Sequence, residues 1–311
     1  MTEATRRRRL DARELHRLLV GVQLAVVTAT VGEIRAVLDA ASGVQALEIA
    51  GKPWWLGRFG GSERPLGSVV VVSGYGGVNA AHALSCLLEA ARPRLVLQVG
   101  IAGAFTGAGL GPGDLAVASS DSYTDLGVQT PTGWLSADGF AEPLAVAADG
   151  RGLRNTFVLD PDLVDAAVRC LHAAEWPDPL PRIGVGPFVT SDLVTGSRER
   201  ADALADRWHA VAESMEGAAA AHICSLYGVP FLEVRGISNL VVDRDRDSWR
   251  VEEAAAVAGQ AALILGEHLG DLLEPARGAA GPEADPANDA PHGGRPETPA
   301  EIAESEAPWS P

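Results

Sequence analysis

The most informative part of the chain runs from residue 213 to residue 239. It reads Glu213-Ser-Met-Glu216-Gly-Ala-Ala-Ala-Ala-His-Ile-Cys-Ser-Leu-Tyr-Gly228-Val-Pro-Phe-Leu-Glu-Val-Arg235-Gly-Ile-Ser-Asn239. The pattern predicts an apolar helix that begins near Glu216 and an apolar strand that ends near Asn239. Open α/β sheets bring polar groups at such helix starts and strand ends to a common edge. This arrangement suits a small polar ligand.

Apolar, β-branched runs recur along the rest of the chain and alternate with helical patterns. Strands are predicted at residues 24–28, 69–73, 95–99, 115–119 and 231–237, and helices at 31–41, 79–91, 161–173, 198–208, 216–227 and 252–269. Continuous apolar runs indicate strands that helices cover on both faces. The order therefore predicts an α/β protein, a three-layer α/β/α sandwich around a mixed, mostly parallel sheet.

The two ends of the chain differ in composition from its middle. Residues 1–20 contain four consecutive arginines and are expected to be a basic leader, either a short helix or a flexible lead-in. Residues 21–274 are predicted to form a single domain. From residue 275 onward Pro, Ala, Gly, Asp and Glu dominate, which predicts a disordered tail because little apolar surface can be buried. The Gly-, Pro- and Asp-rich stretch 130–155 is expected to be a loop, used as a lid or a subunit contact.

Charge and the placement of special residues argue against several classes of function. The formal charge is −16, most of it on residues 21–274, so a nucleic acid is not expected as a partner. The sequence shows no run of about 18 apolar residues and no cleavable signal, so neither a membrane partner nor secretion is expected. Cys86, Cys170 and Cys224 lie far apart, and the histidines lack a zinc-binding spacing. We therefore expect reduced thiols, a cytoplasmic location and no metal.

Two segments after predicted strands carry groups that can do chemistry. Glu33 lies in the first turn of a predicted helix, where it is either a capping carboxylate or a base that orients and deprotonates a water. Ser73-Gly-Tyr-Gly-Gly77 opens another helix, and its amides either form an anion nest or allow tight packing. It is not a dinucleotide fingerprint, because Asn79 occupies the third glycine position.

Further along, Gly100-Ile-Ala102-Gly103-Ala-Phe105 follows a strand, and its small residues either let a flat ligand lie on the backbone or serve close packing. Glu216 is either an ordinary acid at a helix start or a carboxylate that bridges two hydroxyls of a ribose. Asn239 is either a turn residue after a strand or a group that contacts the ligand.

Taken together, these motifs resemble those of the nucleoside phosphorylases and nucleosidases, with Gly113-Asp-Leu as a further match. The resemblance covers roughly residues 24–269 and implies a purine nucleoside substrate, no cofactor and a homo-oligomer. It implies that Glu33 activates water and Asn239 faces the purine. The substrate-binding positions that it implies are Ser73, Ala102, Gly103, Asp192, Met215 and Glu216.

Departures from the family pattern favour some of the family's reactions over others. Phosphorylases grip phosphate with an Arg and a Ser where this chain has Gln98 and Ile101, so the resemblance favours water as the nucleophile. The usual aromatic that stacks on the base is Val194 here, so base stacking either comes from elsewhere, with Phe105 or Phe188 as candidates, or is weaker. Asn239 stands where the family usually has Asp, and an amide that cannot titrate suits a base with a carbonyl at C6.

The segment Asp243-Arg-Asp-Arg-Asp-Ser-Trp249-Arg250 is either a solvated charged loop or part of the site. With the Arg-Gly-Ile-Ser-Asn segment it most resembles the futalosine hydrolase family, which removes hypoxanthine from futalosine in menaquinone biosynthesis. The resemblance implies that Arg244, Arg246 or Arg250 holds the carboxylate of the substrate's carboxybenzoyl group and that Trp249 stacks on its ring. The alternatives are an adenine-releasing methylthioadenosine/adenosylhomocysteine or aminodeoxyfutalosine nucleosidase, and a non-catalytic nucleoside-binding protein. A phosphorylase is the least favoured interpretation.

Overall fold

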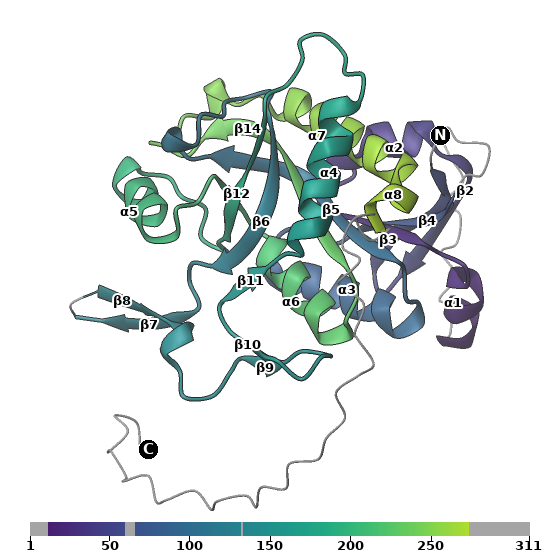
Figure 1. Cartoon of the computed structure of the whole chain (residues 1–311), viewed down its shortest axis with the longest axis horizontal. Helices are drawn as coiled ribbons and strands as arrows, with labels where there is room; N and C mark the ends of the chain where they lie inside the picture. The colour runs from purple at the N-terminus through teal and green to yellow at the C-terminus, as the bar shows by residue number, and fades with distance from the viewer. Residues whose placement is uncertain (1–11, 60–65, 132, 274–311) are drawn as a thin grey trace, which may run out of the picture. The chain divides into compact units, whose positions relative to one another are not determined.

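The centre of the molecule is a mixed sheet of ten strands (Figure 1). The structure is a computed structural model that describes residues 12–59, 66–131 and 133–273. The strands of the main sheet are β1 (Leu24–Thr28), β2 (Ser42–Ile49), β3 (Lys52–Phe59), β4 (Leu66–Val72), β5 (Leu95–Ala104), β6 (Leu115–Tyr123), β11 (Thr156–Val158), β12 (Ile183–Thr190), β13 (Ala212–Ser214) and β14 (Phe231–Leu240). The α-helices are α1 (Ala12–Leu19), α2 (Arg35–Ala40), α3 (Gly77–Ala90), α4 (Pro161–Ala173), α5 (Arg198–Trp208), α6 (Gly217–Tyr227), α7 (Val251–Glu267) and α8 (Leu269–Leu273).

Part of the sheet closes on itself. The strands follow the order β11-β6-β12-β13-β5-β1-β4-β3-β2, and β14 pairs with both β5 and β6. These pairings join β5, β14, β6, β12 and β13 into a ring. The longest ladders, β5 with β14 and β6 with β12, are parallel, whereas β2, β3 and β11 pair in antiparallel fashion. Because β5 and β14 run in parallel, their carboxyl ends meet at one edge of the sheet.

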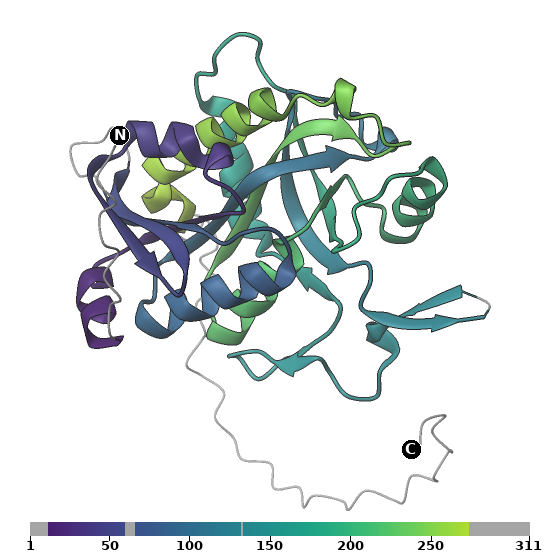
Figure 2. The same cartoon turned by 180° about the vertical axis from the view of Figure 1, so that it is seen from behind.

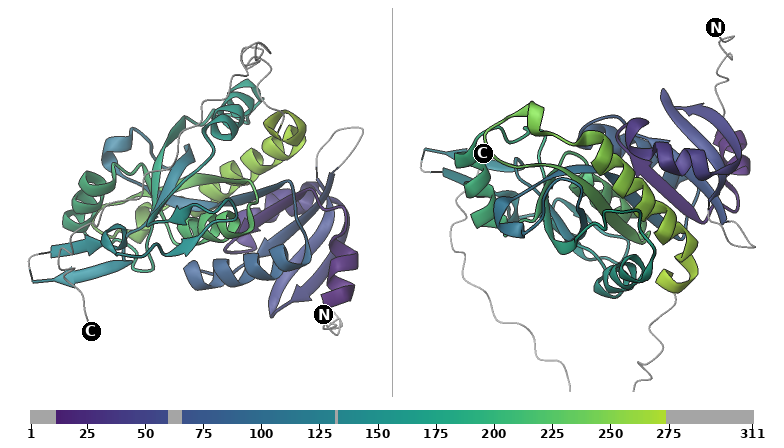
Figure 3. Two further views of the ribbon diagram at one scale, coloured as in Figure 1. Left: turned by 60° about the horizontal axis from the view of Figure 1, so that its bottom comes forward. Right: turned by 90° about the horizontal axis from the view of Figure 1, so that it is seen from above.

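Helices cover the sheet in two groups. Helix α3 packs against α6, while α7 packs against α2, α4 and α8 (Figures 1 and 2). Helix α7 also crosses β14 and β5 (Figure 3). Strand β1 is buried along its whole length, as its continuous apolar run predicts. The predicted α/β sandwich is therefore confirmed, and the predicted elements at 24–28, 161–173 and 198–208 have the observed bounds.

The helix predicted at residues 31–41 is shorter in the structure. A 3-10 turn occupies Gly32–Ile34, and α2 begins only at Arg35. The carboxylate of Glu33 accepts a hydrogen bond from the backbone amide of Thr30 at 2.8 Å, which turns the side chain back toward β1. The first turn is therefore shaped by the contacts of Glu33 and does not begin a regular helix.

The expectation of a loop at residues 130–155 is wrong, because this stretch contains strands. Strand β7 (Gly127–Thr130) pairs with β8 (Gly133–Ser136), and β9 (Ala145–Val146) pairs with β10 (Gly152–Leu153). On β8, Trp134 packs edge-on against Trp208 of α5. The glycines and prolines of this stretch therefore separate short strands that the composition concealed.

Part of the predicted leader belongs to the folded core. Residues 12–19 form α1, where Leu19 is buried and the Nδ1 atom of His16 lies 2.8 Å from the carbonyl of Ala90. Residues 1–11 and the predicted tail from residue 275 lie outside the described residues. Among the helices that the structure describes, none has the length and apolar character needed to cross a membrane.

Candidate functional site

A cavity of about 160 Å³ lies at the edge where β5 and β14 end. We call it the central cavity. It is lined by Ala29, Glu33, Tyr75, Ile101, Ala102, Gly103, Val194, Thr195, Glu213, Ser214, Met215, Glu216, Ser238, Asn239 and Trp249. A second cavity of about 170 Å³, the outer cavity, shares Thr195, Asn239 and Trp249 with it. Seven of the twelve positions predicted from the sequence thus line one space, namely Glu33, Ala102, Gly103, Met215, Glu216, Asn239 and Trp249.

Glu33 is held rigidly at one end of the central cavity. One carboxylate oxygen accepts hydrogen bonds from the Thr28 hydroxyl and from both the amide and the hydroxyl of Thr30, at 2.8–3.2 Å. The other oxygen accepts from the amide of Ile101 at 3.0 Å. The residue is only 7% exposed, yet it borders the cavity. A carboxylate fixed in this way has a defined direction toward a bound water.

Glu216 lies beside Glu33 and has two partners of its own. One oxygen accepts from the amide of Gly76 at 3.0 Å, and the other lies 3.4 Å from Nη1 of Arg235. Burial raises the pKa of Glu216, while the charge of Arg235 and the Gly76 amide oppose this shift. A carboxylate has about four acceptor positions, so Glu216 can still accept hydrogen bonds from a ligand.

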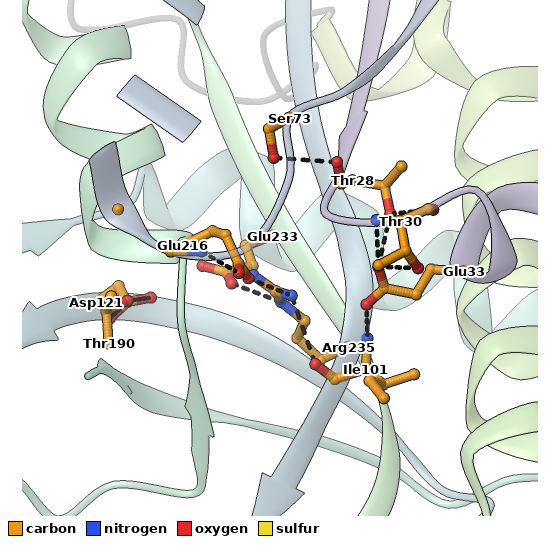
Figure 4. A network of polar contacts seen from close by, with 12 residues as sticks. Thr28, Thr30, Glu33, Ser73, Ile101, Asp121, Thr190, Glu216, Glu233 and Arg235 are labelled. Atoms are coloured by element: carbon orange, nitrogen blue, oxygen red, sulfur yellow. Dashed lines mark hydrogen bonds and ion pairs between the residues drawn. The ribbon is translucent and has the colours of Figure 1, made fainter. Parts of the chain in front are cut away.

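Arg235 connects Glu216 to a second buried carboxylate (Figure 4). Its Nε atom donates to Glu233 at 2.8 Å, and Nη1 lies 3.4 Å from the Ile101 carbonyl. Burial lowers the pKa of Arg235, but the carboxylates of Glu233, Glu216 and Glu33 outweigh burial and raise it above its ordinary value. The guanidinium therefore stays charged between the carboxylates.

Asp121 completes this network behind Glu233. Burial, reinforced by the charge of Glu233, raises the pKa of Asp121 well above its usual range. Both of its oxygens lie 3.0 Å from the hydroxyl of Thr190. An added Cβ on Gly217 would lie within 2.5 Å of carboxyl oxygens of both Asp121 and Glu233, so the two groups face each other across this glycine. The raised pKa favours the protonated form of Asp121 beside Glu233.

Gly100 makes room for the contact between Glu33 and Arg235. A Cβ at this position would lie 2.7 Å from Oε1 of Glu33 and 2.7 Å from Nη1 of Arg235. Gly100 and Arg235 are neighbours on the paired strands β5 and β14. The glycine is thus required by close approach, because any larger side chain would push apart two buried charges.

The other end of the central cavity is formed around Gly103. This residue is paired with Glu213 of β13 on one side and with Asn239 of β14 on the other. The β5–β14 register shifts at Ser238, so that Ser238 and Asn239 both border the cavity. Such an irregularity re-aims side chains at the edge of a sheet.

The amide of Asn239 has a defined orientation. Its Nδ2 donates to the carbonyl of Leu240 at 3.0 Å, and its Oδ1 accepts from the hydroxyl of Ser238 at 2.7 Å. A backbone carbonyl can only accept, so the NH₂ group must face Leu240. The second N–H of this group is left to donate to a ligand.

Glu213 is a further carboxylate at this end, and no role was predicted for it. It accepts from the amide of Thr195 at 3.1 Å and from the Thr195 hydroxyl at 2.5 Å. Burial raises the pKa of Glu213, whereas the hydrogen bonds from Thr195 and the charge of Arg200 lower it. A buried carboxylate of this kind at a cavity wall is a candidate for ligand recognition.

Several predicted positions lie outside the central cavity. The hydroxyl of Ser73 bonds to backbone carbonyls of Thr28 and Gly74. Asp192 accepts a hydrogen bond from the amide of Gly77 and is exposed. Phe105 is 2% exposed and packs in an apolar cluster with Val189 and Val241.

Phe188 is fully buried too, so neither phenylalanine lines the cavity. The structure corrects the expectation that one of them stacks on the purine, because their rings already fill the apolar core.

The arginine-rich segment lies at the outer cavity. Arg244 lines that cavity, and its guanidinium carbon lies 4.9 Å from the centre of the Trp249 ring. The guanidinium carbon of Arg246 lies 5.8 Å from the same ring. Arg250 instead forms an exposed ion pair with Glu253. Trp249 and Asn239 border both cavities, and Arg244 lines the outer one with them.

No group of three or more His, Cys, Asp and Glu side chains is placed to hold a metal ion in the described ranges. The expectation of a metal-free site stays a prediction.

Arg235, Glu233, Asp121 and Glu213 were not predicted to belong to the site. One signal was available, because Glu233 and Arg235 interrupt an otherwise apolar strand. Charged side chains are almost never fully buried unless they are paired. Two opposite charges at i and i+2 of a buried strand therefore indicate an internal ion pair on one face. The partner Asp121 could not be inferred, because it lies on another strand.

Comparison with known proteins shows which families this chain is similar to. A sequence model of the family described as Phosphorylase superfamily matches residues 23–274. The futalosine hydrolase of Thermus thermophilus is 36% identical over 210 residues, which are 67% of this chain and 86% of that protein. The 5′-methylthioadenosine/S-adenosylhomocysteine nucleosidase of Chromohalobacter salexigens is 28% identical over 251 residues, which are 80% of this chain and 98% of that protein.

A solved structure shows the same fold. It is the 5′-methylthioadenosine/S-adenosylhomocysteine nucleosidase of Neisseria meningitidis, in complex with methylthio-immucillin-A. It matches with a TM-score of 0.66 at 24% identity, over 79% of this chain and 98% of that one.

Proposed function

The chain belongs to the phosphorylase superfamily and to the futalosine hydrolase family within it, and we propose that it hydrolyses the N-glycosidic bond of futalosine. The products are hypoxanthine and dehypoxanthine futalosine, and the reaction is a step of menaquinone biosynthesis. The observation that carries this proposal is the pairing of a rigid carboxylate, Glu33, with a neutral amide, Asn239, at opposite ends of one cavity.

In the proposed reaction water attacks C1′ of the ribose. Its oxygen bonds to C1′, one of its protons passes to Glu33, and the C1′–N9 bond breaks. The electron pair of that bond goes to the purine, where the negative charge spreads onto O6. The free N–H of Asn239 donates to the departing base, which then takes up a proton and leaves as hypoxanthine.

Glu216 holds the sugar in this proposal, together with Met215. The remaining acceptor positions of Glu216 bind the 2′- and 3′-hydroxyls. These bonds strengthen as the ribose becomes positively charged in the transition state. Arg235 and the Gly76 amide keep the carboxylate in place while it does so.

Two observations support water over phosphate as nucleophile. Ile101 presents an apolar side chain at the cavity wall. Gln98 is fully buried away from the cavity, and its amide has no hydrogen-bond partner among the residues that the structure describes. Neither residue offers the charge or hydroxyl that would bind a phosphate anion.

The proposal is tested by incubating the full-length protein with futalosine and separating the products by chromatography. Hypoxanthine should appear at a rate that added phosphate does not change. Preferential release of adenine from matched 6-amino nucleosides would instead favour the methylthioadenosine/adenosylhomocysteine type of activity. Phosphate-dependent turnover would indicate a phosphorylase, and binding without release of any base would indicate a nucleoside-binding protein.

Arg244 is our candidate for the carboxylate of the carboxybenzoyl group, with Arg246 beside it and Trp249 against the ring. Arg244 lines the outer cavity, whereas Arg250 is already paired with Glu253. Arg244→Gln should raise the KM for futalosine about tenfold, because a charged hydrogen bond is lost, and leave that for inosine unchanged. Arg250→Gln serves as the control. An unchanged futalosine KM in Arg244→Gln and Arg246→Gln would exclude this role.

Location and assembly complete the proposal. The three cysteines are free, which supports the expected cytoplasmic location. We also propose a homo-oligomer, since Tyr75 and Val194 leave apolar surface exposed beside the cavity. Light scattering on the full-length protein would measure its mass in solution, and a monomer would contradict the proposal.

A further inference from the structure

We propose that Glu213 reads the N1–H group of a 6-oxopurine and, together with Asn239, selects 6-oxo over 6-amino bases. This inference rests on the proposed function and assigns a recognition residue to the base end of the same cavity. It starts from a carboxylate that has no part in the proposed chemistry, although it borders the site.

The sheet places Glu213 and Asn239 on either side of one glycine. Both are the paired neighbours of Gly103, one through β13 and the other through β14. Adjacent strands lie about 4.8 Å apart, so the two backbones are separated by about 10 Å. Directly paired residues project to the same face of a sheet, and here that face borders the central cavity. A flat base lying over Gly103 would therefore have one polar side chain at each side.

The hydrogen bonds around Glu213 define what it offers to a ligand. Arg200, which can only donate, donates from Nε to the Thr195 hydroxyl at 3.2 Å. The hydroxyl proton is therefore free to point at Glu213, whose Oε1 accepts it at 2.5 Å. The Oε2 atom accepts from the Thr195 amide at 3.1 Å. Both oxygens thus act as acceptors, and each keeps a further acceptor position.

Arg200 is itself fixed, which makes this arrangement rigid. Its Nη2 donates to the hydroxyl of Ser191 at 3.1 Å and to the carbonyl of Leu193 at 3.4 Å. The guanidinium supplies positive charge on the far side of Thr195 from the cavity. Glu213 is 8% exposed, so little water reaches its remaining acceptor positions. A ligand that donates a hydrogen bond there satisfies a buried acceptor.

The two classes of purine differ in the groups that would meet this pair. A 6-oxopurine carries a donor at N1–H next to an acceptor at O6, with a second acceptor at N7. Glu213 accepts a hydrogen bond from N1–H, and the free N–H of Asn239 donates to O6 or N7. In a 6-aminopurine N1 is an acceptor and the C6 substituent is a donor. Both contacts then become mismatched, and buried mismatches of this kind are strongly rejected.

The decisive variant is Glu213→Gln, which keeps the shape but adds an NH₂ group. We would measure kcat/KM of the full-length protein for hypoxanthine release from inosine and for adenine release from adenosine. Loss of the acceptor should lower kcat/KM for inosine about tenfold and raise kcat/KM for adenosine about tenfold. The ratio of the two values should therefore change about 100-fold. Glu199→Gln, an exposed acid in the first turn of α5, is the matched control and should leave the ratio unchanged.

A binding measurement separates recognition from folding. By calorimetry, 1-methylhypoxanthine, which lacks the N1–H donor, should bind the parent protein about tenfold more weakly than hypoxanthine does. Glu213→Asp, which keeps the charge, should retain a reduced preference for the 6-oxo base. An unchanged inosine-to-adenosine ratio in Glu213→Gln, or equal binding of both hypoxanthines by the parent protein, would overturn the role of Glu213. Failure of the parent protein to release any base would instead overturn the proposed function.

Discussion

The two ends of the central cavity are built in different ways. At the sugar end Glu33, Glu216 and Arg235 are almost fully buried, and each is held by an ion pair or by hydrogen bonds to its neighbours. At the base end Asn239 is half-buried and Val194 is exposed, while Glu213 is buried and accepts hydrogen bonds from Thr195.

The two ends therefore differ in how well they tolerate substitution. Removing one partner of a buried ion pair leaves an uncompensated charge, so the sugar end can vary only as a unit. At the base end the Asn239 amide is neutral, and Arg200 reaches Glu213 only through the Thr195 hydroxyl, so Asn239 can be exchanged without unpairing a charge. The chemistry is thus tied to the buried ion pairs, whereas the choice of base is set by a few side chains outside them.

The largest effect is expected at the sugar end from Glu33→Gln. The variant keeps the size of the side chain but cannot take a proton from water, so kcat should fall about 1,000-fold or more. Futalosine binding by calorimetry should stay within a few-fold of the parent protein. Glu252→Gln, an exposed acid in the first turn of α7, is the control. Turnover close to that of the parent protein would rule Glu33 out as the base.

A pair of glycine substitutions tests the two ends against each other. Gly100→Ala places a methyl group 2.7 Å from Glu33 and Arg235, neither of which can retreat, so kcat should fall about 100-fold. Gly103→Ala places one 3.0 Å from Nδ2 of Asn239 and should mainly raise KM. Steady-state kinetics on both variants provides the measurement. If both variants changed the same parameter, whether kcat or KM, the two ends of the cavity would not have separate roles in turnover and binding.

At the base end, Asn239→Asp should exchange the preferred base. A carboxyl group can accept from a 6-amino group and can donate only when protonated, so the ratio of hypoxanthine to adenine release should fall by about 10- to 100-fold. Release rates from inosine and adenosine at pH 7 measure this ratio. A variant that still favours inosine as strongly as its parent would show that Asn239 does not read the base.

The smallest expected effect is on the stability of the folded protein, and it comes from Asp121, next to the ion pairs of the sugar end. Because the pKa of Asp121 is raised in the folded protein, folding takes up a proton. Its stabilising contribution is complete below the unfolded pKa, near 4, and is lost as pH rises through the folded value, by at most about 1.4 kcal/mol per pH unit. Asp121→Asn stays neutral and should flatten this decline between pH 5 and pH 8. Urea unfolding at pH 5 and pH 8 gives the slope for each protein, and identical slopes would contradict a raised pKa of Asp121 in the folded protein.

The sequence predicted much of the fold because its signals are local. Buried strands such as β1 show continuous apolar runs, and α4 begins with an Asp cap followed by a proline. Strand β12 was missed because Gly184, Gly186 and Pro187 interrupt it, and the register shifts at that point. Strand β13 has only three residues and no periodicity to detect.

The site was predictable to the extent that its residues lie in motifs. Glu33, Glu216 and Asn239 each follow a recognisable strand or open a recognisable helix, and the structure brings them to one cavity. Glu213 lies beside Asn239 only because β13 and β14 both pair with β5, a relation that no local pattern records. Phe105 was misjudged for the same reason, since the sequence does not tell which side of the backbone an aromatic ring fills.

The ring of strands has a consequence for how the protein acquires its activity. Both walls of the cavity come from strands far apart in the chain, since β5 ends at Ala104 and β14 begins at Phe231. Closing so long a connection costs chain entropy before any contact compensates for it, which makes such pairings slow to form. A nascent chain that has not yet produced β14 has neither Arg235 nor Asn239 in place. Recovery of activity during refolding therefore follows closure of the ring, and an amino-terminal fragment, however well structured, has no site.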